Sequence, residues 1–170
     1  MRQTAWAGHG AALLTILIWG TTFISTKVLL TSFQPVEILF LRFVLGFLAL
    51  CLIYPRRLRL GERRQELWFA AAGLCGVTLY YLLENIALTY TLASNVGVLV
   101  SVSPVFTALF SHFLLRREKL RPAFFAGLVV ALAGVVLLSY NGSAVLKLDP
   151  RGDVLALLAA AIWSAYSLIT

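Results

Sequence analysis

Long apolar runs alternate with short polar segments along the whole chain. A helix needs roughly 20 apolar residues to cross a hydrocarbon core of about 30 Å. Five runs reach that length, and they cover Gly10–Leu30, Val36–Tyr54, Leu67–Thr91, Ala93–Leu115 and Ala123–Tyr140. A sixth begins near Val154 and has at most about 17 residues, close to the shortest span. The pattern predicts an all-α, polytopic transmembrane helix bundle with five full helices and a truncated sixth.

Composition supports a membrane protein. Hydrophobic residues make up 61% of the chain and charged residues 12%, whereas a soluble domain carries about 25% charge. No segments of about ten alternating residues indicate a β-barrel. The first run is too long for a signal-peptide core and lacks a small-residue cleavage site. We therefore expect it to remain as a helix.

Basic residues lie in short clusters between the apolar runs, so the net charge of +7 reflects topology and not nucleic-acid binding. With the N-terminus in the cytoplasm, ten Lys and Arg side chains fall inside and only Lys147 and Arg151 fall outside. The inside set is Arg2, Arg56, Arg57, Arg59, Arg63, Arg64, Arg116, Arg117, Lys119 and Arg121. The bias predicts a multi-pass protein of the cell (inner) membrane with a cytoplasmic N-terminus.

The first and sixth apolar runs resemble each other. Residues 9–26 and 153–170 align without gaps and share the pairs Ala12/Ala156, Leu13/Leu157, Leu14/Leu158, Ile18/Ile162, Trp19/Trp163 and Thr26/Thr170. The two runs are five helices apart, so they cross the membrane in opposite directions. Such an inverted repeat is the arrangement of many secondary transporters.

Several stretches resemble the EamA family of the drug/metabolite transporter superfamily. They are "WGTTFISTK" in the first run, Arg42-Phe43, "ALTYTLASNVGVLVSVSPVFTALFSHFLLRREKL" and "GLVVALAGVVLL". The resemblance implies two inverted five-helix halves that export metabolites, amino acids or toxic compounds by alternating access. It implies residues 1–140 as the first repeat, 141–152 as an external linker and 153–170 as the start of the second repeat.

This division has a consequence for activity. We expect the chain to act with a missing second half of the transporter, or with a second chain, around a small-molecule substrate, and not to transport alone. Two alternatives remain open at this point. The chain is a membrane assembly or scaffold fragment without transport, or it transports only as a dimer.

Four ionisable residues fall within or near the helices, where a buried charge is a functional hypothesis. Lys27 lies about 4–5 Å below the outer rim, where its ammonium can snorkel to the interface. Glu37 follows Pro35 closely and is expected at the interface. Arg42 and Glu84 both lie about 10 Å inside, at one level.

An unpaired charge at that depth costs several kcal/mol, so we expect Arg42 and Glu84 to contact each other directly or through water. The pair either fixes the bundle or lines the substrate or proton path. Glu84 is the candidate proton carrier, and Lys27 is its fallback partner.

Polar and small residues also fall on single helix faces. The first run has an aromatic and hydroxyl face, and the third and fourth have faces rich in small residues. We expect the small residues of the fourth and fifth runs to serve close helix packing. The candidate substrate-binding residues are Trp19, Thr22, Thr26, Arg42, Tyr80, Glu84, Trp163 and Tyr166.

No motif supports an enzyme, a cofactor or a metal site. HExxH, GxSxG and a phosphate-binding loop are all missing from the sequence. Cys51 and Cys75 both fall within apolar runs, where small bundle-facing or lipid-facing roles are more common than a disulfide or a metal site.

The charge bias makes a topology prediction. Single cysteines placed in residues 55–66 or 116–122 should resist an impermeant thiol reagent in intact cells, because these loops are expected in the cytoplasm. A cysteine placed near Ser143 should be labelled. The reverse labelling pattern would refute the orientation and the shared depth of Arg42 and Glu84.

Overall fold

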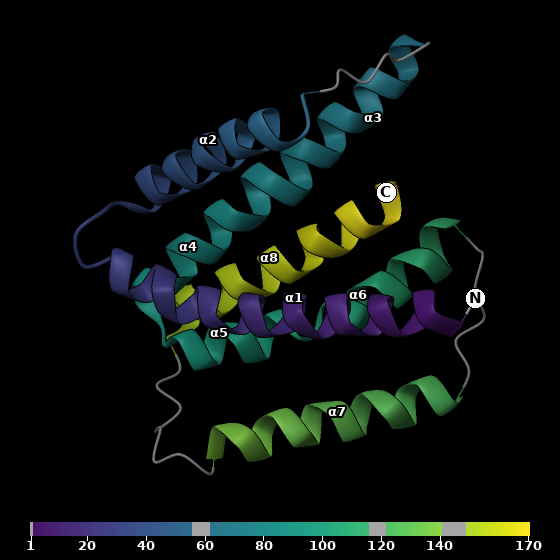
Figure 1. Cartoon of the computed structure of the whole chain (residues 1–170). Coiled ribbons are helices and arrows are strands. Elements are labelled where there is room, and N and C mark those ends of the chain that lie inside the picture. Colours follow the sequence, from purple (N-terminus) through teal and green to yellow (C-terminus); the bar gives the residue numbers. More distant parts are fainter. Residues whose placement is uncertain (1, 56–61, 116–121, 141–148) are drawn as a thin grey trace.

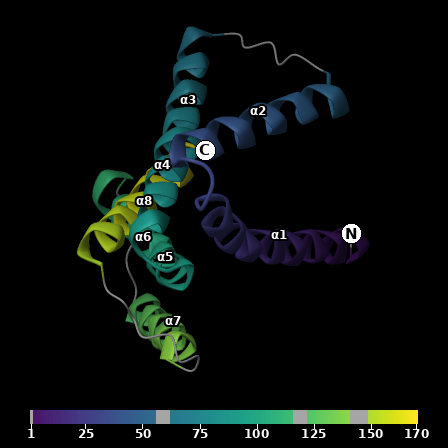
Figure 2. The same ribbon diagram turned by 90° about the vertical axis from the view of Figure 1, so that its left-hand side faces the viewer.

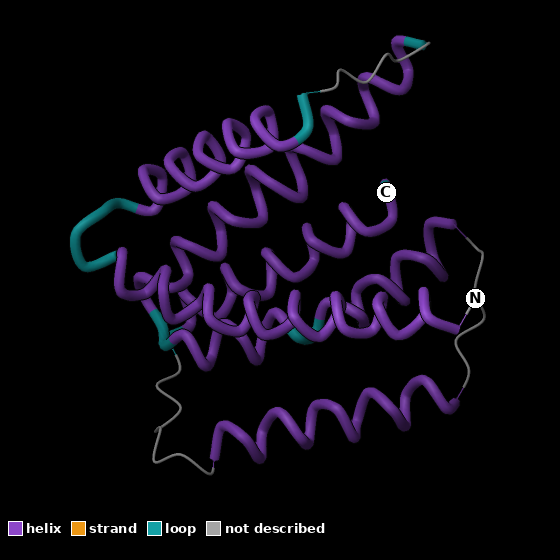
Figure 3. The backbone as a smooth tube through the Cα atoms, viewed as in Figure 1, coloured by secondary structure: helices purple, strands orange, loops and turns teal. Residues whose placement is uncertain are grey.

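The computed structural model describes residues 2–55, 62–115, 122–140 and 149–170, and these residues are almost entirely helical (Figures 1 and 3). The helices are α1 (Arg2–Leu29), α2 (Pro35–Ile53), α3 (Arg63–Gly73), α4 (Tyr80–Tyr90), α5 (Ala93–Val100), α6 (Ser103–Phe110), α7 (Pro122–Tyr140) and α8 (Pro150–Ile169). Two π-helical turns, η1 (Leu74–Leu79) and η2 (Ser111–Leu115), continue α3 and α6. The predicted all-α bundle is confirmed.

All six predicted helices are present. The third run is the continuous unit α3–η1–α4, and the fourth is α5–α6–η2. Within the described part of the chain, five helices are long and apolar enough to span a membrane: Gly8–Leu29, Pro35–Ile53, Arg63–Tyr90, Ala93–Phe113 and Pro150–Ile169. The chain is therefore a multi-pass membrane protein.

The sixth helix is longer than its apolar pattern suggests. It begins at Pro150 instead of near Val154, and its 20 residues exceed the expected 17. Asp149 caps it, since its carboxylate accepts a hydrogen bond of 3.0 Å from the backbone N–H of Arg151. Proline is favoured in the first turn, where its missing N–H needs no partner. The length of α8 suffices for a membrane span.

Helix α8 packs through a stripe of small residues. Gly152, Ala156, Ala160 and Ser164 follow one another at four-residue spacing, and all are buried. In a lipid bilayer the hydrophobic effect does not drive helices together, so they associate through close packing. Small side chains allow two helix backbones to approach closely. The partners of α8 include α4, α5, α6 and η1. Figure 1 shows α8 between α4 and α6, and Figure 2 shows these helices gathered on one side, with α1 and α2 extending to the other.

Two polar residues, Lys27 and Asn85, connect α1 and α2 to the C-terminal half of α4. The ammonium of Lys27 donates hydrogen bonds to the backbone carbonyls of Leu88 and Thr91, the latter at 2.8 Å. Carbonyls at the end of a helix lack internal partners and favour cations. The amide of Asn85 donates to the carbonyl of Pro35 at 3.1 Å, where α2 begins.

The start of α2 is closed by a capping box. The backbone N–H of Gln34 donates to the carboxylate of Glu37 at 2.8 Å. Glu37 is exposed at the first turn of its helix, which agrees with its expected place at the interface. The Glu37 carboxylate thus accepts a hydrogen bond from a backbone N–H at the N-terminus of α2, where a negative charge is favourable.

A break between α5 and α6 lies in the fourth span. Pro104 lacks the N–H that would bond the carbonyl of Val100 in a continuous helix. The hydroxyl of Ser103 donates to that carbonyl at 2.6 Å instead. The hydroxyl of Ser164 on α8 donates to the carbonyl of Ser103 at 2.8 Å. Inside a membrane such irregular backbone is tolerated where protein side chains satisfy it or where it borders a cavity.

The contact between Gly152 and the end of α4 makes a stability prediction. A Cβ at position 152 would lie 3.0 Å from side-chain carbons of Thr91 and Tyr90. Gly152→Val should therefore push α8 away from α4 and destabilise the protein by about 1–3 kcal/mol. The measurement is thermal unfolding in detergent. Gly20→Val is the matched control, because a Cβ at position 20 of α1 would meet nothing within 4 Å. Equal losses in both variants would contradict close α4–α8 packing.

Candidate functional site

A cavity of about 920 Å³ opens among the membrane-spanning helices. Its wall comes from every described span, although α2 supplies one residue, Arg42, and α7 supplies only Phe124. The remaining lining residues are Ile18, Trp19, Thr22, Phe23, Tyr80, Tyr81, Glu84, Gly97, Val100, Ser101, Ser103, Pro104, Thr107, Ala108, Ser111, Trp163, Ser167 and Leu168. The volume suits a small organic molecule.

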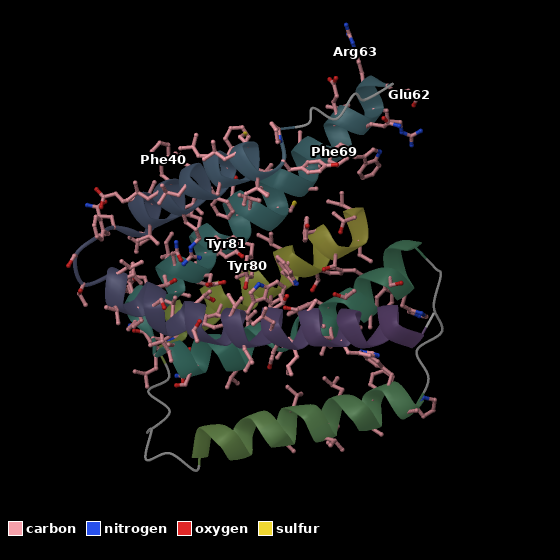
Figure 4. The ribbon with its side chains drawn as sticks, viewed as in Figure 1. Phe40, Glu62, Arg63, Phe69, Tyr80 and Tyr81 are labelled. Carbon is pink, nitrogen blue, oxygen red and sulfur yellow. The ribbon has the colours of Figure 1, made fainter. Side chains whose placement is uncertain are left out.

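Aromatic rings form one side of the cavity. Trp163 of α8 packs against Tyr80 of α4 with ring centroids 4.9 Å apart, and against Trp19 of α1 at 5.9 Å. The two tryptophan rings meet edge to face, at 88°. Figure 4 shows Tyr80 and Tyr81 near the middle of the bundle. Aromatic walls of this kind suit planar, apolar or cationic groups.

One carboxylate and one guanidinium face the same cavity. Glu84 is only 2% exposed and interacts with the hydroxyl of Tyr80, one turn earlier on α4. Arg42 donates a hydrogen bond of 2.6 Å to the hydroxyl of Thr26, and its guanidinium carbon lies 5.4 Å from the centre of the Tyr81 ring. Among the described residues, no salt bridge joins Arg42 to Glu84. The two groups form no direct ion pair, so contact between them through water stays a prediction.

Hydroxyl groups form the opposite side. Ser101, Ser103, Thr107 and Ser111 follow the break between α5 and α6. Three of them are held by backbone: Ser101 donates to the carbonyl of Val98 at 2.6 Å, Ser103 to Val100 at 2.6 Å and Thr107 to Ser103 at 3.0 Å. Each hydroxyl oxygen keeps a lone pair that a ligand can use.

The small residues of the fourth span have a second role besides the packing that was predicted for them. Gly97, Ser101, Pro104, Ala108 and Ser111 all line the cavity. A Cβ at Gly97 would meet nothing within 4 Å, as expected for a residue that borders open space. Both halves of the fourth span also contact α8, whose buried small residues allow a close approach.

Six of the eight predicted substrate-binding residues line the cavity: Trp19, Thr22, Arg42, Tyr80, Glu84 and Trp163. The other two support the wall from behind. Thr26 is fully buried and accepts the Arg42 hydrogen bond. Tyr166 packs against the Trp163 ring at 5.1 Å and covers Gly76, where a Cβ would lie 2.5 Å from the tyrosine ring.

Lys27 is occupied elsewhere. Its ammonium bonds the carbonyls of Leu88 and Thr91, at the end of α4, and not the carboxylate of Glu84. Lys27 thus joins α1 to α4 and is not the partner of Glu84. Its snorkelling to the interface stays a prediction.

Sequence reasoning missed several lining residues. Tyr81 follows Tyr80 and falls on a neighbouring face of the third span, so a single-stripe assignment leaves it out. Ser103 and Thr107 directly precede Pro104 and Ala108, so they lie at the edge of the stripe in the fourth span and a one-residue-wide stripe leaves them out. Pro104 in the middle of an apolar run was the available signal.

Comparison with known proteins identifies the relatives of this bundle. The model of the EamA-like transporter family matches residues 6–140. The chain belongs to the EamA-like transporter family. This confirms the resemblance drawn from the first, second, fourth and fifth apolar runs.

Several curated relatives of this EamA chain are transporters. An uncharacterized transporter of Archaeoglobus fulgidus is 32% identical over 165 residues, which cover 95% of this chain and 56% of the relative. The uncharacterized inner membrane transporter YhbE of Escherichia coli is 31% identical, covering 98% of the chain and 54% of the relative. The E. coli inner membrane transporter YedA is 28% identical and is covered to 50%. The chain thus spans about half the length of these relatives.

A solved crystal structure agrees with the fold. It is 28% identical to this chain and superposes with a TM-score of 0.58, covering 90% of the chain and 53% of the other protein. The bundle therefore resembles about half of a larger protein in structure as well as in sequence.

Proposed function

We propose that the chain forms one side of the substrate path in an EamA-type transporter that exports small organic metabolites or amino acids. The observation that carries this proposal is the cavity, which combines aromatic faces with one carboxylate and one guanidinium inside the membrane-spanning region. Polar groups at that depth are costly and mark substrate or ion paths. A molecule bearing an ammonium and a carboxylate would find a partner for each.

The arrangement of α1 and α8 supports alternating access. The two helices run in opposite directions in Figure 1. Trp19 and Trp163, which occupy equivalent positions in the aligned segments, contact each other in the cavity wall. Contact between equivalent residues is what a two-fold axis through the cavity would produce, as in inverted-repeat transporters. We place that axis near the Trp19–Trp163 contact.

Glu84 is the proposed proton carrier. It is the one buried carboxylate of the described chain that faces the cavity, and it lies beside the Tyr80 hydroxyl. A carboxyl group in this position can exchange a proton with the cavity and thereby alternate between a charged and a neutral form. The second partner of the path is the remaining half of the transporter or another chain, in the lipid bilayer of the inner membrane, with the N-terminus in the cytoplasm.

Ligand binding is testable through the tryptophans of the cavity. The purified chain in lipid nanodiscs is titrated with amino acids, organic cations and organic anions while tryptophan fluorescence is recorded. A ligand that enters the cavity should change the emission of Trp19 and Trp163, and Glu84→Gln should weaken its affinity about tenfold or more, equal to about 1.4 kcal/mol. Trp68→Phe is the control, since Trp68 lies on α3 outside the cavity wall.

Two results would contradict the binding site. One is the absence of any change across the whole panel. The other is a change that persists in the Trp19→Phe/Trp163→Phe double variant.

Transport is measured separately, as efflux from cells that make the 170-residue chain or the chain joined to the second half of the A. fulgidus relative. We expect efflux only from the joined form. Efflux from the chain alone, with cross-linking that shows a dimer, would favour the paired short chain. Ligand binding without efflux in either form would favour a non-transporting membrane protein.

A further inference from the structure

The two charges of the cavity do not neutralise each other. A guanidinium and a carboxylate that line one cavity ordinarily form a bidentate pair, because the two groups match in shape and gain strength away from water. Among the residues that the structure describes, Arg42 and Glu84 form no such pair, although their charges influence each other. Another contact must therefore keep the guanidinium and the carboxylate apart.

Arg42 is held by a residue of another helix. Its guanidinium donates to the hydroxyl of Thr26 on α1 at 2.6 Å and lies over the ring of Tyr81, 5.4 Å from the ring centre. Thr26 is fully buried, so no water competes for its hydroxyl. A short hydrogen bond from a charged donor at a dry site is stronger than an ordinary neutral one.

The position of Thr26 is fixed by its neighbour in sequence. Lys27 donates to the carbonyls of Leu88 and Thr91, at the end of α4, the helix that carries Glu84. The Thr26 hydroxyl is thereby kept at a constant place relative to that helix. Two adjacent residues of α1 therefore contact two other helices. Thr26 binds Arg42 of α2, and Lys27 binds the end of α4.

We infer that Thr26 is a positioning residue: its hydroxyl holds the Arg42 guanidinium away from the Glu84 carboxylate, so that both charges stay open to the cavity. Without this acceptor the guanidinium loses its hydrogen bond, and Glu84, which lines the same cavity and is already influenced by its charge, is the carboxylate that would attract it. The pair would then close and the cavity would lose both charges. This inference concerns the apo geometry and does not depend on transport.

The test is a double-mutant cycle between Arg42 and Glu84, measured twice. Unfolding midpoints in detergent are recorded for Arg42→Ala, Glu84→Gln and the double variant, first in the wild-type background and then with Thr26→Val. Valine matches threonine in shape and removes only the hydroxyl. In the wild type we expect a modest coupling, in which the double variant loses less stability than the sum of the two single losses. In the Thr26→Val background the coupling should be at least about twice as large, because a direct pair replaces an interaction across the cavity.

Two controls separate positioning from general damage. Thr26→Ser keeps the hydroxyl and should restore the wild-type coupling. Thr21→Val removes a hydroxyl from the same helix, one that bonds only the local carbonyl of Ile18, and should leave the coupling unchanged. If Thr26→Val does not fold, Thr26→Ala removes the same acceptor and replaces it in the cycle.

Coupling that rises with Thr26→Val and returns with Thr26→Ser supports the inference. Coupling that is equal or smaller without the hydroxyl overturns it, and so does an equal rise with Thr21→Val. A loss of stability in Thr26→Val would also follow from a purely structural role. The coupling between Arg42 and Glu84 is therefore the readout that decides.

Discussion

The close approach of α8 to α4 is the interaction on which the cavity depends. Gly152, Ala156, Ala160 and Ser164 are small and buried, so α8 can approach α4 and the fourth span closely. This packing places Trp163 against Tyr80 and lets Ser164 reach the carbonyl of Ser103 at the break in the fourth span. The aromatic side and the hydroxyl side of the cavity therefore both derive their positions from α8.

The second constraint is the cost of polar groups in hydrocarbon. Several polar side chains in the bundle satisfy backbone groups: Lys27 bonds the end of α4, Asn85 the start of α2, and Ser103 the carbonyl that Pro104 leaves free. These contacts join helices that apolar packing alone would hold loosely in lipid. Glu84 differs, since it lines the cavity and its described partner is the hydroxyl of Tyr80, another lining residue. A buried carboxylate at a cavity wall is the strongest sign of function in the bundle.

The sequence predicted the helices well because each apolar run is long and is ended by charges, proline or polar loops. It also predicted most of the site, since Trp19, Thr22, Tyr80 and Glu84 repeat at helical spacing and mark one face of each helix. The start of α8 was misplaced because Asp149 and Pro150 lie before the apolar run, although a capping residue followed by proline is itself a helix-start signal.

What the sequence did not predict is how the faces of different helices meet. Periodicity places Arg42 and Glu84 at one depth but leaves open that Thr26 of a third helix takes the guanidinium. It also cannot tell a small residue that packs from one that borders a cavity. Gly76 and Gly97 both lie in apolar runs, yet a Cβ at Gly97 meets nothing within 4 Å and one at Gly76 would lie 2.5 Å from the Tyr166 ring. Such differences depend on three-dimensional packing.

The central claim, that α8 lies directly on α4 and thereby forms the cavity, is tested most directly by a disulfide. The Cβ of a residue at position 152 would lie 3.0 Å from the Cβ of Thr91, so a small outward shift of α8 brings the pair to the disulfide separation of about 3.5–4.5 Å. A Thr91→Cys/Gly152→Cys pair, with Cys51 and Cys75 replaced by serine, should cross-link rapidly in membranes under mild oxidation and protect both thiols from a maleimide. The control pair, Thr91→Cys/Gly20→Cys, should stay reduced. Cross-linking no faster than in the control would contradict the account.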